Sequence, residues 1–111
     1  MTTPISLRPI APQDEPFLYR VYASTRADEL AAVSWSEADK QAFLAMQFHA
    51  QSTYYREQFG QAAFQLVLLD GQPIGRLYLD RRADEIRIID IALLAEHRRK
   101  GIGTQLLGEI L

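Results

Sequence analysis

Three cations and two glycines stand together in residues 97–103, which read HRRKGIG. They are Arg98, Arg99, Lys100, Gly101 and Gly103. A glycine carries no Cβ, so a ligand can approach the main chain closely at that point. Where a helix begins, its first N–H groups have no intrahelical partner and the helix dipole adds partial positive charge. These residue types at this spacing therefore predict a site for a phosphate or pyrophosphate.

The residues on either side predict the elements that would position this loop. Residues 86–94 are mostly Ile and Leu, interrupted by Arg87 and Asp90, which is typical of a central strand covered on both faces. From Thr104 onwards the apolar positions change to helical spacing. These positions are Leu107, Ile110 and Leu111. We therefore expect a buried strand, a short basic loop and the start of a helix.

Two common nucleotide motifs do not fit the glycines of this loop. The dinucleotide fingerprint G-x-G-x-x-G would need a third glycine where Leu106 stands. The P-loop would need a lysine directly after Gly108, where Glu109 stands. Neither of these modes of nucleotide binding is therefore expected.

The pattern that remains is Arg98-x-x-Gly101-x-Gly103. It resembles the Gln/Arg-x-x-Gly-x-Gly/Ala signature of the GNAT N-acetyltransferase superfamily, whose members bind the pyrophosphate of acetyl-CoA at this motif. The apolar strand before it and the Leu106-Leu107 pair after it strengthen the resemblance. The alternative interpretation is a basic loop that caps a helix and binds no ligand.

Two helices are expected in the first half of the chain. Asp14 is a plausible N-cap for the first helix, whose apolar face carries Leu18, Val21, Tyr22 and Thr25. The pattern is irregular over residues 28–35. Ser36-x-x-Asp39 is a capping signal that opens a long second helix ending near Gly60. One face of this second helix is expected to carry Phe43, Met46, Ala50 and Tyr54.

Strands are expected before and after these helices. Residues 5–10 form a short first strand that ends at its proline. Residues 63–69 and 74–79 form two further strands, joined by a hairpin turn at Asp70-Gly71. A polar connection then leads to the strand at 86–94.

The predicted order is β-α-α-β-β-β-α, an α+β fold with a mostly antiparallel sheet. It matches the order of GNAT domains, so the resemblance covers residues 1–111. Family members continue beyond the third helix, whereas this sequence stops at Leu111 with no glycine cap and no proline. We therefore interpret the chain as a single incomplete domain, truncated after the cofactor-binding helix. One sheet edge would be open, so we expect a homodimer through edge pairing or strand exchange.

Composition limits the class of protein. At 111 residues the chain is one domain at most. The net charge of −2 argues against a general nucleic-acid binder. The absence of cysteine excludes disulfides and thiolate metal sites, and two distant histidines suggest no other metal site. No membrane span or signal peptide is recognisable, which favours the cytoplasm.

The resemblance assigns the cofactor-binding residues. In the family, main-chain N–H groups at the end of the fourth strand hold the cofactor arm and polarise the thioester. These positions correspond to Ile91, Ala92 and Leu93. The pyrophosphate loop corresponds to Arg98, Arg99, Lys100, Gly101, Ile102, Gly103 and Thr104.

The catalytic base is harder to assign. Many family members carry a glutamate where this chain has Arg87, so two nearby carboxylates are the candidates. Glu85 shares the side-chain parity of Arg87 along the strand, whereas Asp90 should point to the opposite face. A carboxylate inside an apolar run must be hydrogen bonded or functional. For Asp90 a structural role is our first interpretation and a catalytic role the alternative.

The resemblance implies an N-acetyltransferase that transfers acetyl from acetyl-CoA to a small-molecule or peptide amine by direct attack. One alternative is a non-catalytic CoA-binding or dimerising half-domain, and another is a phosphate-binding regulatory module. Aromatic residues around the second helix could border the acceptor site, although core packing is the simpler explanation for them. They are Trp35, Tyr54 and Tyr55.

Overall fold

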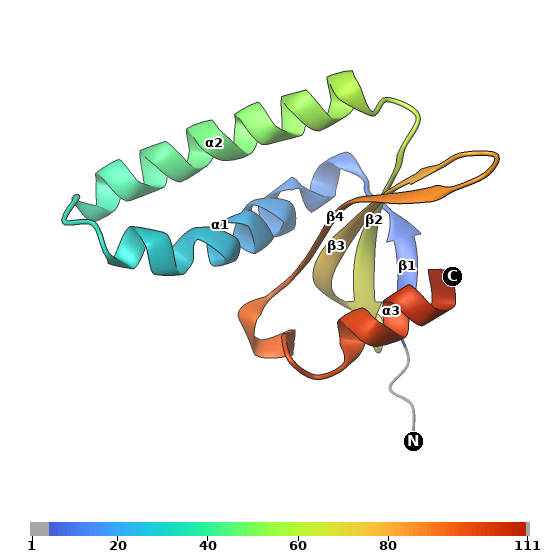
Figure 1. The fold of residues 1–111 in the computed structure, drawn as a ribbon. Coiled ribbons are helices and arrows are strands. Elements are labelled where there is room, and N and C mark those ends of the chain that lie inside the picture. Colours follow the sequence, from blue (N-terminus) through green and yellow to red (C-terminus); the bar gives the residue numbers. More distant parts are fainter. Residues whose placement is uncertain (1–4, 111) are drawn as a thin grey trace.

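The computed structural model describes residues 5–110, which form a four-stranded sheet and three α-helices (Figure 1). The strands are β1 (Ile5–Pro9), β2 (Ala63–Leu69), β3 (Gln72–Arg81) and β4 (Ile86–Leu93). The helices are α1 (Glu15–Ala31), α2 (Glu37–Gln58) and α3 (Ile102–Ile110). Short 3-10 turns, η1 (Pro12–Asp14) and η2 (Ala95–His97), precede α1 and follow β4. The predicted α+β class and the order β-α-α-β-β-β-α are confirmed.

The sheet is antiparallel throughout, with the strands in the order β1-β2-β3-β4. The hairpin between β2 and β3 turns at Asp70-Gly71, where both residues have positive φ, 51° and 81°. Glycine takes such angles freely and aspartate tolerates them, so the predicted turn is confirmed.

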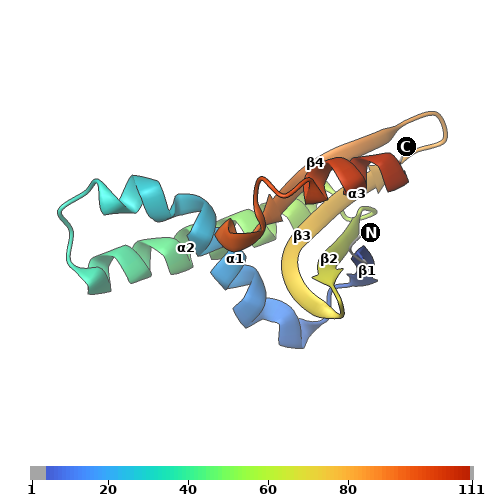
Figure 2. The same cartoon turned by 90° about the horizontal axis from the view of Figure 1, so that it is seen from below.

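Helices cover both faces of the sheet (Figures 1 and 2). The antiparallel pair α1 and α2 packs on one face, and α3 packs on the other. The described residues form two hydrophobic cores, one on each face of the sheet. The first core contains side chains of α1 and α2 together with Leu66 of β2, and the second contains side chains of α3 together with Val67, the next residue of β2. Successive side chains of a strand point to opposite faces, so β2 contributes to both cores.

The helix boundaries partly match the prediction. Ser36 caps α2 as expected, because its Oγ accepts the Asp39 N–H at 3.1 Å. α1 continues to Ala31, into the stretch predicted to be irregular, because Leu30 is buried in the first core. Asp14 precedes α1, but its carboxylate accepts the Ala11 N–H instead of capping the helix.

The predicted apolar face of α2 is correct only at Phe43, which is partly buried and packs against the first core. Leu44 and Phe48 are the buried residues of this helix, whereas Met46 and Tyr54 are 58% and 55% exposed and Ala50 is also exposed. Apolar side chains lie on more than one side of α2. Periodicity alone therefore could not decide which side faces the sheet.

The prediction that β4 is a central strand is also wrong for the described residues. β4 lies at the edge of the sheet, and Ile86, Ile88 and Ile91 are 36–40% exposed. An open sheet edge, which the sequence did predict, is therefore present in residues 5–110 along β4.

A bulge in β4 overturns the parity argument for Asp90. Tyr78 pairs with Asp90 while Leu79 pairs with Ile88, so one extra residue lies in β4. A bulge of this kind resets the alternation of side chains. Because Arg87 pairs with Asp80, which shares a face with Tyr78, Asp90 lies on the same face as Arg87.

The third helix begins at Ile102, two residues before the predicted start at Thr104. Leu111, the last of its predicted apolar positions, lies outside the described residues. No helix in the described part of the chain combines the length and apolar character needed to cross a membrane.

Candidate functional site

A groove of about 520 Å³ lies where β4 ends and the following loop turns into α3. It is lined by Ile91, Ala92 and Leu93 of β4, by Arg98, Arg99 and Gly101 of the loop, by Gly103 and Thr104 of α3, and by Thr25 of α1. The fold thus brings together all the predicted cofactor-binding residues except Lys100 and Ile102.

The loop conformation leaves open space in front of both glycines. Arg99 and Gly101 have positive φ, 60° and 77°, and turn the chain sharply into α3. A Cβ added at Gly101 or Gly103 would meet no heavy atom within 4 Å. The first intrahelical bond runs from the Gln105 N–H to the Gly101 carbonyl at 3.0 Å, so the earlier N–H groups have no intrahelical partner. The groove can therefore accept an anion against bare main chain.

Arg98 holds the loop in place. Its Nε donates to the Leu93 carbonyl at 2.9 Å, and its Nη2 donates to Ser24 Oγ of α1 at 3.0 Å. The side chain thus ties the end of β4 to α1 while its charge stays at the groove. Lys100 and Ile102, the two predicted cofactor-binding residues that do not line the groove, differ in exposure. Lys100 is exposed, and the side chain of Ile102 is buried in the core with Leu106.

The end of β4 is fixed by an unusually close neighbour. A Cβ at Gly75 of β3 would lie 2.3 Å from the Ala92 carbonyl oxygen, a distance that real Cβ atoms essentially never reach. The Leu94 N–H also bonds to the Ile74 carbonyl at 2.8 Å. β3 therefore needs a glycine here for β4 to present the groove residues.

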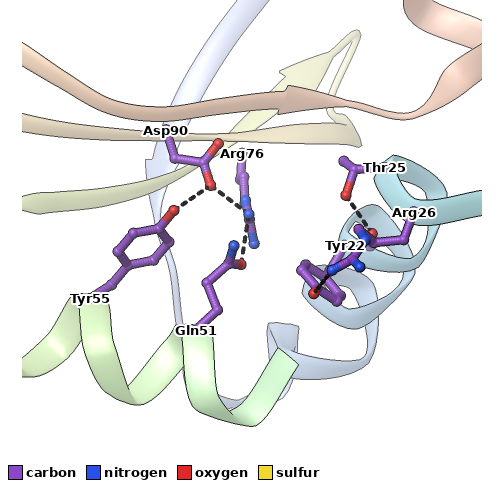
Figure 3. A network of polar contacts seen from close by, with 7 residues as sticks. All are labelled: Tyr22, Thr25, Arg26, Gln51, Tyr55, Arg76 and Asp90. Carbon is purple, nitrogen blue, oxygen red and sulfur yellow. Dashed lines mark hydrogen bonds and ion pairs between the residues drawn. The ribbon is translucent and has the colours of Figure 1, made fainter. Parts of the chain in front are cut away.

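Beside the groove, Asp90 belongs to a polar network between the sheet and α2 (Figure 3). Its Oδ2 accepts from Tyr55 Oη at 3.1 Å and from Nη2 of Arg76. The same Nη2 donates to Gln51 Oε1 at 3.0 Å. Arg76 is only 3% exposed, and its guanidinium lies 5.2 Å from the centre of the Tyr78 ring. Asp90 therefore has the hydrogen bonds that a structural role predicts, and its catalytic role stays a prediction.

The tyrosines of this network remain protonated. Burial, together with the Asp90 charge, raises the pKa of Tyr55 to about 12. Burial also raises the pKa of Tyr78. Tyr55 consequently donates its hydrogen bond to Asp90 throughout the physiological pH range.

Glu85, the other candidate base, is not brought to the groove. It is exposed at the β3–β4 turn, where its carboxylate lies 3.3 Å from Arg87. Ile91 is six residues further along the chain, which is about 20 Å for an extended strand. Of the two proposed carboxylates, only Asp90 adjoins the groove, because it directly precedes Ile91.

Several residues at this site were not predicted from the sequence. Ser24 and Thr25 come from α1, far from the motif, and no local pattern marks them. Arg76 did carry a signal, because it stands among apolar residues of a predicted strand. A buried arginine needs an anionic partner, and the next strand carries Asp90 inside its apolar run.

Comparison with known proteins agrees with this geometry. Residues 18–111 match the sequence model of the acetyltransferase (GNAT) family. No curated protein sequence matches the chain.

Solved structures share the fold. PaiA N-acetyltransferase from Thermoplasma acidophilum, solved in complex with coenzyme A, aligns with a TM-score of 0.62 at 20% identity, over 96% of this chain and 69% of that one. A GCN5-related N-acetyltransferase from Rhodopseudomonas palustris gives 0.61 at 19% identity, over 99% and 66%. An acetyltransferase from Thermus thermophilus gives 0.58 at 20% identity, over 96% and 66%.

The chain spans about two thirds of the length of these solved proteins. At such identities the structural likeness concerns the fold, whereas the sequence match covers most of the chain. The match falls on the groove, the glycine loop and both long helices. The chain therefore belongs to the GNAT acetyltransferase family, and its fold is that of an acyltransferase.

Proposed function

We propose that the protein is an N-acetyltransferase that uses acetyl-CoA and an amine acceptor. The observation that carries this proposal is the groove, in which bare first-turn amides of α3 and two arginines meet the end of β4. A diphosphate suits such a site because the helix dipole, the N–H groups and the guanidinium charges all favour an anion.

The same groove suits the rest of the cofactor. β4 is an edge strand, so main-chain groups on its outer side are free of strand partners in the described residues. An extended amide-containing arm can bond to such groups as an added strand would. In this arrangement Ile91, Ala92 and Leu93 hold the arm and direct an N–H at the thioester oxygen.

Acetyl-CoA supplies the acyl group: the neutral amine nitrogen bonds to the carbonyl carbon, the carbon–sulfur bond breaks, and the proton that the nitrogen loses passes to the departing thiolate, which leaves as the thiol. The acceptor must first lose a proton, because an amine with a pKa near 10 is only about one part in a thousand neutral at pH 7. We assign Asp90 as the group that receives this proton, directly or through one water. Arg76 and Tyr55 keep its carboxylate oriented next to Ile91.

A second candidate function is a CoA-binding half-domain that pairs with another copy. The open edge of β4, with its exposed isoleucines, favours this alternative. Sedimentation velocity tests it directly. A concentration-dependent dimer that Ile88→Pro abolishes would support edge pairing, and a monomer at all concentrations would exclude it.

Calorimetry with acetyl-CoA, combined with a thiol-release assay on an amine panel, separates the candidates. Binding with amine-dependent thiol release supports the enzyme, and binding without release supports the half-domain. Inorganic pyrophosphate binding as tightly as acetyl-CoA would indicate a phosphate module. No binding of either compound would contradict the proposed function.

A further inference from the structure

A second cavity, of about 380 Å³, lies between α2 and the sheet. It shares no lining residue with the groove at β4. Four aromatic side chains from α2, β2 and β3 form its walls, and we call this cavity the aromatic pocket. They are Phe48, Tyr55, Phe64 and Tyr78. Its volume falls in the range of small-molecule sites, which are typically concave and mostly apolar.

Ring packing fixes the shape of the aromatic pocket. Phe64 and Tyr78 meet edge to face, with ring centres 4.8 Å apart and an interplanar angle of 88°. Tyr55 meets Tyr78 in the same way, at 5.4 Å and 90°. The rings come from β2, β3 and α2, so the three elements support one another. Edge-to-face contacts of this kind are favourable, and a preformed wall reduces the entropy lost on binding.

Charge at the rim does not favour a polycation. Glu15 and Arg56 both line the cavity, and their opposite charges offset each other. His49 and Ser52 are the other polar residues of the lining besides the tyrosines. Aromatic faces nevertheless attract an alkylammonium group and stack with a flat apolar body. Selection would therefore depend on the rings and not on the net charge of the pocket.

Asp90 connects the aromatic pocket to the groove. Its carboxylate accepts the hydrogen bond of Tyr55, a wall of the pocket, and it is bonded through the main chain to Ile91, a wall of the groove. Figure 3 shows Tyr55 and Arg76 converging on this carboxylate from α2 and β3. One hydrogen bond and one peptide bond therefore separate a wall residue of the pocket from a wall residue of the groove.

We propose that the aromatic pocket binds the acyl acceptor, and that this acceptor is an amine carried on an aromatic body. That the occupant is an acceptor rests on the proposed function, but the pocket itself can be tested without acetyl transfer. Polyamines and lysine-rich peptides are poor matches, because the pocket offers rings and no excess of carboxylates.

The test is direct binding of 2-phenylethylamine to the full chain, with n-butylamine as the ring-free comparison. Calorimetry should show 2-phenylethylamine binding at least about tenfold more tightly, a difference of about 1.4 kcal/mol. Ser52→Trp places a large side chain in the pocket and should weaken that binding by at least about tenfold. Ala50→Trp, on the exposed side of the same helix, is the matched control and should bind like the parent.

Equal affinity for the two amines, or unchanged binding in Ser52→Trp, would overturn the inference. Circular dichroism checks that each variant is folded. If Ser52→Trp does not fold, Phe64→Leu keeps an apolar side chain and removes a ring, so it should lose the preference for the aromatic amine.

Acetyl-CoA titrations of the same proteins separate this inference from the proposed function. If the parent protein binds 2-phenylethylamine but not acetyl-CoA, acetyl transfer is refuted and the assignment of the pocket stands. If it binds acetyl-CoA but not 2-phenylethylamine, only the assignment of the pocket is refuted.

Discussion

The groove and the aromatic pocket share no lining residue and are built from different parts of the chain. The groove is mainly a main-chain site, made by bare amides and glycines within one short stretch. The pocket and the network beside it are side-chain sites, assembled from separate elements by Phe48, Phe64, Arg76 and Tyr55. Main-chain sites depend on backbone conformation, which local sequence largely determines, whereas side-chain sites depend on tertiary packing.

The largest expected effect on stability concerns the ion pair between Arg76 and Asp90, compared with the exposed pair between Arg87 and Glu85. Arg76→Met should destabilise the protein by about 3–5 kcal/mol, because it removes one partner of this ion pair and leaves the Asp90 carboxylate without its cation. Urea unfolding measures the change. Arg87→Met is the matched control, since its exposed pair with Glu85 should contribute about 0–1 kcal/mol. A double change of Arg76→Met and Asp90→Leu should recover much of the loss. Similar effects for Arg76→Met and Arg87→Met would show that the network is not a stabilising unit.

The groove can be disturbed through the backbone alone. Gly75→Ala places a Cβ against the Ala92 carbonyl and should cost about 1–3 kcal/mol of stability through overpacking. The same change at Gly108, a helical position with open space around it, should stabilise by about 1 kcal/mol. Thermal unfolding of the two variants compares them directly. Melting temperatures that change in the same direction in both variants would contradict the close approach of β3 and β4.

The smallest expected effect concerns the hydrogen bond from Tyr55 to Asp90. Tyr55→Phe should destabilise by about 1 kcal/mol. Because the folded-state pKa is raised to about 12 from 10.0, the stabilisation is complete below pH 10 and is lost as the pH rises from 10 towards 12. Urea unfolding at several alkaline pH values should show this loss in the parent and its reduction in Tyr55→Phe. Parallel pH profiles would show that the fold does not raise the pKa of Tyr55.

The same division explains what the sequence could predict. The element order, the Asp70-Gly71 turn and the Ser36 cap all follow from local signals, and each was identified. The groove residues of β4 were assigned through the resemblance, and Thr25 was missed. The buried face of α2 did not follow, because the helix has apolar residues on several sides.

The position of Asp90 was also beyond local reasoning. The extra residue in β4 is visible only in its pairing with β3, and it turns the carboxylate to the α2 side. There Asp90 meets Arg76 and Tyr55, which are 14 and 35 residues away in the chain. Such pairs are set by tertiary structure, and a single sequence carries little trace of them.

The most direct test of the account is calorimetric titration of acetyl-CoA into Gly103→Asp, with Gly108→Asp as the matched control. An acidic residue in the first turn suits the dipole of α3, so the variant should fold while its carboxylate occupies and repels the diphosphate site. We expect Gly103→Asp to lose at least about 100-fold in affinity, roughly 2.7 kcal/mol, and Gly108→Asp to bind like the parent. Near-parental affinity in Gly103→Asp, or an equal loss in both variants, would contradict the placement of the cofactor at the first turn of α3.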